Sequence, residues 1–253
     1  MLNREITKKI NDAILDAGRI ILTADRSAET VTEKAGHANF VTSYDQAIQE
    51  MLQKRLLEIL PEAVFVGEEE DVHAQIREGY SFIVDPIDGT TNFIRDMHCS
   101  TVSIGLLLDA EPVYAAIYNP YLDELYTAEK GCGAFLNGQP IRVSDKPLSE
   151  SIVLFGTSPY YPELAKSGFE LLIKLFNRAL DVRRFGSAAY DLCMVAAGRA
   201  ELFFEMQLSP WDYAAGSLIV KEAGGRATQI DGSPLSFGHP CSVLARGGQN
   251  EEI

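Results

Sequence analysis

The chain has 253 residues, of which 46% are hydrophobic and 23% are charged, and its formal net charge is −14. This length suits one large domain or two closely packed lobes. The strong negative charge argues against a nucleic-acid surface, which needs a basic patch, so nucleic acid is an unlikely partner. It also means that an anionic ligand would need metal ions or local amides to be held.

The first eleven residues are mixed polar, and no apolar run approaches the length of a membrane span. We therefore expect a cytoplasmic protein that does not associate with membranes. The four histidines give no H-E-x-x-H spacing, and the four cysteines form no close pair, which excludes zinc-knuckle and C-x-x-C sites. We expect the cysteines to be buried free thiols: Cys99, Cys132, Cys193 and Cys241.

The first part of the chain is predicted to be mainly helical. Apolar residues recur at helical spacing, and the second helix has Gln46 placed as a possible capping-box partner for Ser43. The expected elements are a helix over 6–21, a loop over 31–40, a helix from Ser43 to Ile59 and a strand over 63–66. That strand runs into the acidic sequence Gly67-Glu68-Glu69-Glu70.

An apolar run from Tyr80 to Val84 predicts a buried strand that ends in two carboxylates, Asp85 and Asp88. Pro86 joins them and Gly89 closes the turn. Because ligands of α/β proteins bind beyond the ends of strands, two acids here suggest divalent metal ions and a phosphate. The alternative is an Asx-type turn without chemistry.

The rest of the chain predicts an antiparallel meander followed by alternating strands and helices. The meander strands are expected over 101–108, 113–118, 124–128 and 133–136, and Asn137-Gly138 is a hairpin signal. The later elements are strands over 151–156, 182–185 and 201–205 and helices over 163–180, 187–197 and 211–223. This alternation indicates an α/β fold with layered elements. Lys146-Pro147 is the best candidate for a boundary between an N-terminal lobe, 1–146, and a C-terminal lobe, 147–253.

Four acids at predicted element ends form a candidate metal site: Glu68, Asp85, Asp88 and Asp212. Magnesium binds hard oxygen ligands, and a two-metal phosphatase needs several acids converging from different elements. Asp85 is the natural bridging ligand, and Pro86 can direct the Ile87 carbonyl inward. Each acid also has a structural interpretation: Glu68 in a solvated acidic run, and Asp212 as a helix cap.

Gly89-Thr90-Thr91 is predicted to open a short helix, and its free amides would suit a phosphoryl group. The Thr90 hydroxyl could orient or deprotonate a water if an acid accepts its proton. A simple threonine cap is the alternative.

Three sequence motifs, in the same order, resemble the signatures of the inositol monophosphatase family. They are Gly67-Glu68-Glu69, the nine residues DPIDGTTNF from Asp85 to Phe93, and the segment from Trp211 to Gly225 that begins WDYAAG. The resemblance covers nearly the whole chain. It implies an α-β-α-β-α sandwich of the sugar-phosphatase type, in which both lobes pack as one unit, and it implies a homodimer.

The resemblance also implies an activity, the Mg²⁺-dependent hydrolysis of a phosphorylated polyol or sugar by metal-activated water, with inositol 1-phosphate as the expected substrate. Two to three Mg²⁺ ions would bind to Glu68, Asp85, the Ile87 carbonyl, Asp88 and Asp212. Glu68, Thr90 and Asp45 would act on the attacking water. Substrate would meet Asp88, Gly89, Thr90, Ala188, Glu205 and Asp212.

Other interpretations remain open for several of these residues. Asp45 could be a first-turn helix acid, Glu205 an exposed acid beyond a strand, and Lys34 a solvated loop lysine, whereas Trp211 is expected to be a core anchor. Asn39 stands where the family usually has an aspartate, which puts loop order or a weak third ion in doubt.

The substrate is also open. Fructose 1,6-bisphosphate, a 3′-phosphoadenylate or another sugar phosphate are the alternatives within the superfamily. A regulatory protein associated with transcription complexes is the alternative from another class.

Overall fold

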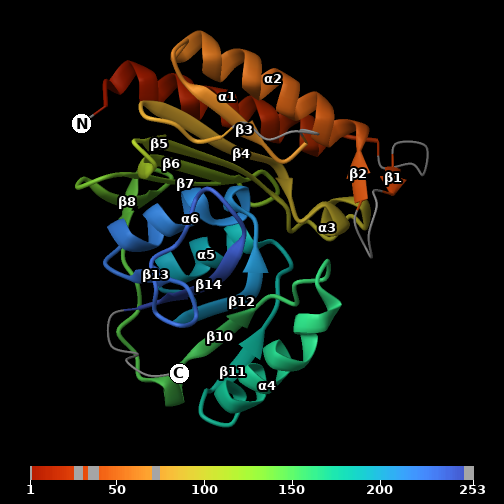
Figure 1. The fold of residues 1–253 in the computed structure, drawn as a ribbon, viewed down its shortest axis with the longest axis vertical. Helices are drawn as coiled ribbons and strands as arrows, with labels where there is room; N and C mark the ends of the chain where they lie inside the picture. The colour runs from red at the N-terminus through yellow and green to blue at the C-terminus, as the bar shows by residue number, and fades with distance from the viewer. Residues whose placement is uncertain (1, 26–30, 34–39, 70–74, 248–253) are drawn as a thin grey trace.

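The structure, a computed structural model, describes residues 2–25, 31–33, 40–69 and 75–247. Its elements stack in five layers: two helices, a seven-stranded sheet, two helices, a five-stranded sheet and one helix (Figure 1). The layers of helices are α1 (Arg4–Thr23) with α2 (Ser43–Ile59), α5 (Ala188–Ala196) with α6 (Pro210–Glu222), and α4 (Ala165–Phe176). The α/β class and the α-β-α-β-α order predicted from the sequence are confirmed.

The seven-stranded sheet follows the order of its strands in the chain. Its strands are β3 (Val64–Gly67), β4 (Tyr80–Asp88), β5 (Thr101–Leu108), β6 (Glu111–Asn119), β7 (Glu124–Glu129), β8 (Gly133–Leu136) and β9 (Gln139–Ile141). β3 pairs with β4 in parallel and all other neighbours are antiparallel, so the predicted meander is confirmed. Asn137 and Gly138, with φ of 49° and 75°, form the predicted two-residue turn into β9.

Strand β4 extends through the acidic motif, so the predicted strand end at Val84 is wrong. Asp85 pairs with Ser103 and Asp88 pairs with Thr101, which leaves one extra residue in β4. Residues three apart on a regular strand face opposite sides, whereas a bulge with one extra residue brings them to the same side. The bulge is therefore what aligns the two aspartates.

The five-stranded sheet has the strand order β11-β10-β12-β14-β13. Its strands are β10 (Ile152–Phe155), β11 (Asp181–Arg183), β12 (Leu202–Leu208), β13 (Arg226–Thr228) and β14 (Cys241–Arg246). β10 is parallel to β11 and β12, and β14 runs antiparallel between β12 and β13. The sequence prediction missed β9, β13 and β14. The lobe boundary at Lys146-Pro147 stays a prediction.

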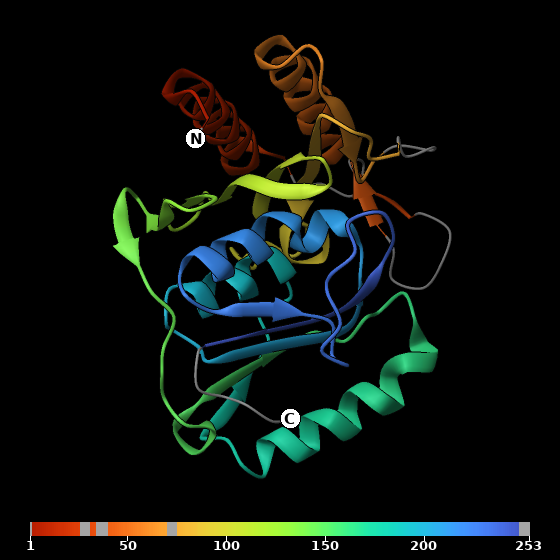
Figure 2. The same ribbon diagram turned by 60° about the vertical axis from the view of Figure 1, so that its left-hand side comes forward.

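Helices α5 and α6 lie between the two sheets and supply about half of the buried residues of the central core (Figure 2). Every residue of α5 is buried, and α6 buries a run from Tyr213 to Val220. The two helices cross closely at Gly216, where an added Cβ would lie 2.5 Å from a methyl carbon of Leu192. This middle layer brings the start of α6 to the edge of β4.

The N-terminal helices differ from prediction in their details. The capping box of α2 uses Thr42 and Asp45, not Ser43 and Gln46. Ser43 is already the first residue of the helix, so the N-cap is the residue before it, Thr42. The predicted loop over 31–40 begins with a short strand, β1 (Val31–Glu33), and ends where its antiparallel partner β2 (Phe40–Thr42) begins. Lys34 and Asn39 lie outside the described residues.

Other differences concern the last helix layer and the cysteines. Helix α4 is shorter than the predicted 163–180, because a 3₁₀ turn over Pro162–Leu164 precedes it and it ends at Phe176. All four cysteines are free thiols, but only Cys193 and Cys241 are buried: Cys99 is partly buried and Cys132 is exposed. No helix among the described residues is long and apolar enough to cross a membrane, and a cytoplasmic location stays a prediction.

Candidate metal and phosphate site

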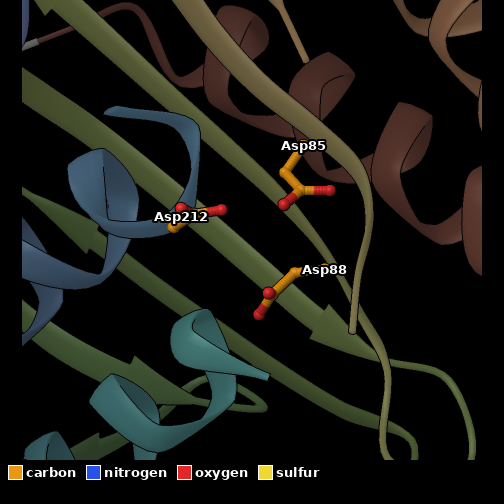
Figure 3. A group of neighbouring side chains, drawn as sticks. All are labelled: Asp85, Asp88 and Asp212. Atoms are coloured by element: carbon orange, nitrogen blue, oxygen red, sulfur yellow. The ribbon is translucent and has the colours of Figure 1, made fainter. Parts of the chain in front are cut away.

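Three aspartates from two distant segments meet at one end of a cleft (Figure 3). Asp85 and Asp88 come from the bulged end of β4, and Asp212 comes from the first turn of α6. One carboxylate oxygen from each lies within 4.8 Å of the others. Glu68, whose backbone N–H donates to the Val84 carbonyl at 3.2 Å, lines the same cleft directly after β3. The sequence-predicted acids are therefore brought together.

Asp85 is the most deeply placed acid of this group. It is 1% exposed, and its own Oδ1 accepts the N–H of Ile87 at 3.0 Å. Burial raises the pKa of Asp85 well above its usual value, and the charges of Glu68, Asp88 and Asp212 raise it further. Because a cation would relieve both effects, this carboxyl group is suited to bind one.

Asp88 is held by the start of α5. Its carboxylate accepts the Ser187 hydroxyl, the N–H of Ala189 at 2.7 Å and the N–H of Ala188 at 3.3 Å. The Thr101 hydroxyl lies 3.5 Å away. Burial raises the pKa of Asp88, and these donors oppose the rise. Ala188, predicted to contact substrate, therefore has its N–H directed at Asp88 in this structure.

Asp212 caps the start of α6, as one of its two interpretations predicted. As the third residue of α6 it accepts the Ser209 N–H at 2.7 Å in a capping box, which fixes its side chain at the helix start. Burial, followed by the charges of Asp88 and Glu68, raises its pKa well above the usual value. Its neighbour Trp211 is half-buried and lines the cleft, so it is not solely the core anchor that the sequence suggested.

Thr90 connects the acidic cluster to helix α2. Its hydroxyl lies 3.1 Å from the Ile87 carbonyl and 3.3 Å from Asp45 Oδ1. The other oxygen of Asp45 accepts the N–H of Thr42 at 2.8 Å. Burial raises the pKa of Asp45 to about 6, although its hydrogen bonds to Thr42 oppose this. Asp45 is thus both a helix-capping acid and an acceptor for the Thr90 hydroxyl.

Gly89 begins the short helix α3 (Thr90–Ile94), as predicted, in a left-handed conformation with φ of 86°. A Cβ at this position would lie 3.0 Å from the Gly186 carbonyl oxygen and 3.2 Å from that of Cys99. Glycine is therefore required here both by backbone conformation and by the close approach of two other chain segments. Its packing against Gly186 joins the acidic motif to the segment before α5.

The cleft has a volume of about 750 Å³ and extends from the acidic cluster to Glu205 on β12. Glu205 is 6% exposed, so its interpretation as an exposed acid is wrong. Its Oε1 accepts the N–H of Ser158 at 2.7 Å. Burial raises the pKa of Glu205 to about 7, while the Ser158 N–H and the Arg184 charge oppose the rise.

The sequence prediction missed several residues that shape this cleft. Ser187 and Thr101 hold Asp88, and Asp191 is a fully buried acid on the cleft wall. Ser158 and Tyr160 also line the cleft. Ser187 could have been found as the serine that caps α5, but nothing local in the sequence connects the others with the acidic motif.

The donor set fits magnesium. All candidate ligands are oxygens, which are the hard ligands that Mg²⁺ prefers. The raised pKa values of the clustered carboxyl groups show that their negative charges are unfavourable together, and a bound cation would compensate for them. No nitrogen or sulfur donor joins the group among the described residues, which disfavours zinc or copper.

The layered fold, with an acidic oxygen cluster beside a glycine-bounded turn, defines an α/β protein with a largely buried acidic site. A sequence model of the inositol monophosphatase family matches residues 2–253, and the chain belongs to this family, which is a family of phosphatases.

Bacterial relatives carry three different names. The chain is 39% identical to inositol-1-monophosphatase of Rhizobium meliloti, over 80% of this chain and 77% of the relative. It is 37% identical to fructose-1,6-bisphosphatase/inositol-1-monophosphatase of Aquifex aeolicus, over 82% and 78%. It is 36% identical to Nus factor SuhB of Salmonella typhimurium strain LT2, over 85% and 82%.

Solved structures agree with this assignment. The extragenic suppressor protein suhB from Bartonella henselae superimposes with a TM-score of 0.89 at 34% identity, covering 97% of this chain and 95% of that one. The inositol monophosphatase from Anabaena superimposes with a TM-score of 0.84 at 32% identity, covering 96% and 90%. An inositol monophosphate-bound SaIMPase-II superimposes with a TM-score of 0.81 at 28% identity, covering 97% and 90%.

Proposed function

We propose that this protein is a Mg²⁺-dependent phosphomonoesterase that hydrolyses inositol 1-phosphate to inositol and phosphate. The observation that carries the proposal is the convergence of Asp85, Asp88 and Asp212, with oxygens within 4.8 Å, at one end of a cleft. Phosphoryl transfer needs positioning and charge neutralisation more than covalent chemistry, and this arrangement can supply both.

The metal-holding residues would be Glu68, Asp85, Asp88, Asp212 and the Ile87 carbonyl, with two to three ions in all. Magnesium, when bound, would supply Lewis-acid polarisation of the phosphoryl group and a lowered pKa for water. The Ile87 carbonyl faces the Thr90 hydroxyl, which places both groups at the same point of the site.

The chain's own residues would orient the nucleophile. Thr90 Oγ1, held between the Ile87 carbonyl and Asp45 Oδ1, would hold the attacking water and pass a proton to Asp45. Glu68, which lines the same cleft, would assist. The backbone amides of Gly89 and Thr90 would bind the phosphate at the start of α3.

The alcohol part of the substrate would lie toward α5 and β12. Asp88, Ala188 and Glu205 would meet its hydroxyl groups, with Asp212 at the junction between phosphate and alcohol. Glu205 is kept in place by the Ser158 N–H, and Asp88 by the amides at the start of α5. These fixed acceptors favour a polyol over a simple alkyl alcohol.

A phosphate-release panel tests this proposal. Purified protein would be given inositol 1-phosphate, fructose 1,6-bisphosphate, a 3′-phosphoadenylate and glycerol 2-phosphate, each with MgCl₂ or with EDTA. We expect Mg²⁺-dependent release, with inositol 1-phosphate having the highest kcat/KM. A higher kcat/KM for fructose 1,6-bisphosphate would favour the second name carried by the Aquifex relative.

A regulatory role is the second candidate, because several relatives are named Nus factor SuhB. Absence of Mg²⁺-dependent release from every substrate in the panel would favour this role over catalysis. The acidic composition of the chain opposes direct contact with RNA in either case.

We also propose that two copies of the chain form a homodimer through α4. Four large apolar side chains spaced by four, three and four residues are at least half exposed: Phe169, Ile173, Phe176 and Leu180. This spacing places them on one side of α4 and the turn that follows it. An apolar stripe on the outermost layer is suited to a self-complementary contact.

A further inference from the structure

The segment that follows β10 lines the cleft and is fixed by hydrogen bonds to β12. Ser158, at its centre, is 3% exposed and has a left-handed backbone with φ of 44°. Its N–H donates to Glu205 Oε1 at 2.7 Å, and its Oγ accepts the N–H of Gln207 at 3.0 Å. The N–H of Tyr161 then donates to the Ser158 carbonyl at 2.8 Å. A non-glycine residue keeps such a conformation only when its surroundings determine it.

Glu205 and this segment support each other. An added Cβ on Gly156 would lie 1.8 Å from Glu205 Oε2, so the Glu205 carboxyl group lies directly against the backbone of the segment. Only glycine allows that approach. The backbone that precedes Pro159 and Tyr160 is therefore held by β12, the strand that carries Glu205.

Pro159, Tyr160 and Tyr161 of this segment all line the cleft, and Tyr160 is the one on whose phenol the charges of the acidic cluster act. It is 50% exposed and lines the same cleft as Glu68 and Asp212. Burial raises the pKa of the Tyr160 phenol, and so do the charges of the acidic cluster, including Glu68, Asp212 and Asp85. Tyr160 is therefore a neutral aromatic side chain in the neighbourhood of the acids.

The cleft is thus lined both by polar groups, such as Asp88 and Glu205, and by the aromatic side chains of Tyr160, Tyr161 and Trp211. Asp88 and Glu205 can bind hydroxyl groups on the edge of an alcohol, but neither can cover an apolar face. A cyclitol or pyranose ring carries hydroxyl groups around its edge and C–H groups on its faces, whereas an acyclic polyol has no such face. Aromatic side chains contribute chiefly through the apolar area that they cover.

We propose that Tyr160 is a specificity-determining residue, whose ring packs against the face of a cyclic alcohol and makes the enzyme select cyclic over acyclic phosphomonoesters. This inference rests on the proposed phosphatase function and adds to it a substrate class and a residue. The ring face of Tyr160, rather than its phenol oxygen, would select between cyclic and acyclic substrates.

Two variants and two substrates test the inference. KM and kcat would be measured for the wild type, Tyr160→Ala and Tyr160→Phe with inositol 1-phosphate and with glycerol 2-phosphate. We expect Tyr160→Ala to raise KM for inositol 1-phosphate about tenfold, which corresponds to roughly 50–60 Å² of apolar area left uncovered. Its kcat, its KM for glycerol 2-phosphate and its half-activating Mg²⁺ concentration should change less than threefold.

Tyr160→Phe is the matched control, because it keeps the ring and removes the hydroxyl. It should retain the wild-type KM for both substrates. Equal losses on the two substrates in Tyr160→Ala, no change in KM for inositol 1-phosphate, or a Tyr160→Phe variant as impaired as Tyr160→Ala would each overturn the inference. A wild type that hydrolyses only glycerol 2-phosphate would also overturn it, while leaving phosphatase function intact.

If the wild type hydrolyses neither substrate, the proposed function fails, but the inference about Tyr160 can still be tested. Binding then decides the inference: the rise in Tm caused by each phosphate in the presence of MgCl₂ would be compared between wild type and Tyr160→Ala. A rise specific to inositol 1-phosphate that disappears in Tyr160→Ala supports the ring contact. Equal rises in the two proteins, or none in either, contradict it.

Discussion

At the scale of single residues, the site is an arrangement of acids whose ionised forms are unfavourable without a cation. Asp85, Asp88 and Asp212 all have raised pKa values, chiefly because burial disfavours their charge. Asp88 is satisfied by four hydrogen-bond donors, whereas Asp85 has mainly other acids around it. The residue that depends most on metal for compensation is therefore Asp85.

Replacing Asp85 by asparagine should abolish most Mg²⁺-dependent turnover. A single transition-state contact of the oxyanion type contributes about 3–4 kcal/mol, so we expect kcat to fall by a factor of about 100 or more. Glu201→Gln is the matched control, because Glu201 is a buried acid that accepts the Ile152 N–H away from the cleft. Wild-type turnover in a folded Asp85→Asn protein would contradict the metal-site assignment.

The raised pKa of Glu205 predicts that the free energy of unfolding depends on pH. Its pKa is raised to about 7, so the folded protein holds this proton more tightly than the unfolded chain does. Its contribution to stability is present below the usual glutamate pKa and is lost as pH rises toward 7. Glu205→Gln avoids that loss and should increase the unfolding free energy at pH 8 by up to roughly 3 kcal/mol.

Urea unfolding in EDTA at pH 4.5 and pH 8 measures this effect. At pH 4.5 the wild type and Glu205→Gln should differ little, because the glutamate is protonated when folded. A variant that is less stable than the wild type at pH 8 would show that ionised Glu205 stabilises the apo fold through Arg184 and Ser158, contrary to our expectation.

At the scale of elements, the bulge in β4 and the crossing of α5 with α6 determine where the acids meet. The bulge turns Asp85 and Asp88 to the same side of β4, and the crossing of the two helices determines where α6 begins relative to that strand. Gly216 on α6 approaches Leu192 on α5 so closely that an added Cβ would lie 2.7 Å from its Cβ. Packed interiors tolerate such additions poorly.

Gly216→Ala should therefore destabilise the protein by about 1–3 kcal/mol, despite the better helix propensity of alanine. Gly168→Ala is the matched control in α4, where the added Cβ would meet only the flexible side chain of Met206 at 3.2 Å. That variant should be neutral or more stable by up to about 1 kcal/mol. Thermal or urea unfolding of the two variants tests the contrast, and equal effects would refute it.

The same elements explain what the sequence could and could not predict. The periodicity of α1 and the hairpin signal at Asn137-Gly138 are local, so both were predicted correctly. Pro86 and two acids are typical of a turn, so the extension of β4 was not. The short strands β13 and β14 lie among turn residues and form only by pairing with each other and with β12.

The same distinction between local patterns and tertiary contacts applies to the residues of the site. The acids were found because their motifs occur at element ends and resemble a family signature. Ser187 and Thr101 were missed because their role depends on contact with Asp88 from α5 and β5. Tyr160 was missed because its position depends on the backbone of Ser158, which no local pattern reveals.

At the scale of the whole molecule, metal should act on stability as well as on activity. Because the three aspartates have raised pKa values, the apo protein binds more protons than its unfolded chain, and their contribution to stability falls as pH rises above the usual aspartate range. A bound cation replaces those protons and removes the loss. We expect MgCl₂ to raise Tm more at pH 8.5 than at pH 5.5.

Thermal unfolding with EDTA or MgCl₂ at both pH values tests this prediction. The Asp85→Asn variant should show a smaller Mg²⁺-induced rise at pH 8.5 than the wild type. A rise that is as large at pH 5.5 as at pH 8.5 would argue against binding by these carboxylates.

The apolar stripe on α4 predicts self-association. Ile173 is 59% exposed at the centre of the stripe, so Ile173→Lys should weaken the proposed homodimer by placing a charge in the contact. Leu122→Lys, at a site 56% exposed between β6 and β7, is the control and should leave association unchanged. Sedimentation velocity over a range of concentrations measures both, and a monomeric wild type would contradict the proposal.

The meeting of β4 with α6 has a consequence for how the protein is made. During synthesis, Asp85 and Asp88 leave the ribosome long before Asp212, and α6 must dock between the two sheets before the three carboxylates can converge. An incomplete nascent chain therefore lacks the full set of ligands. Magnesium affinity should arise only at the last stage of folding, so a truncated product would not compete with the finished protein for metal.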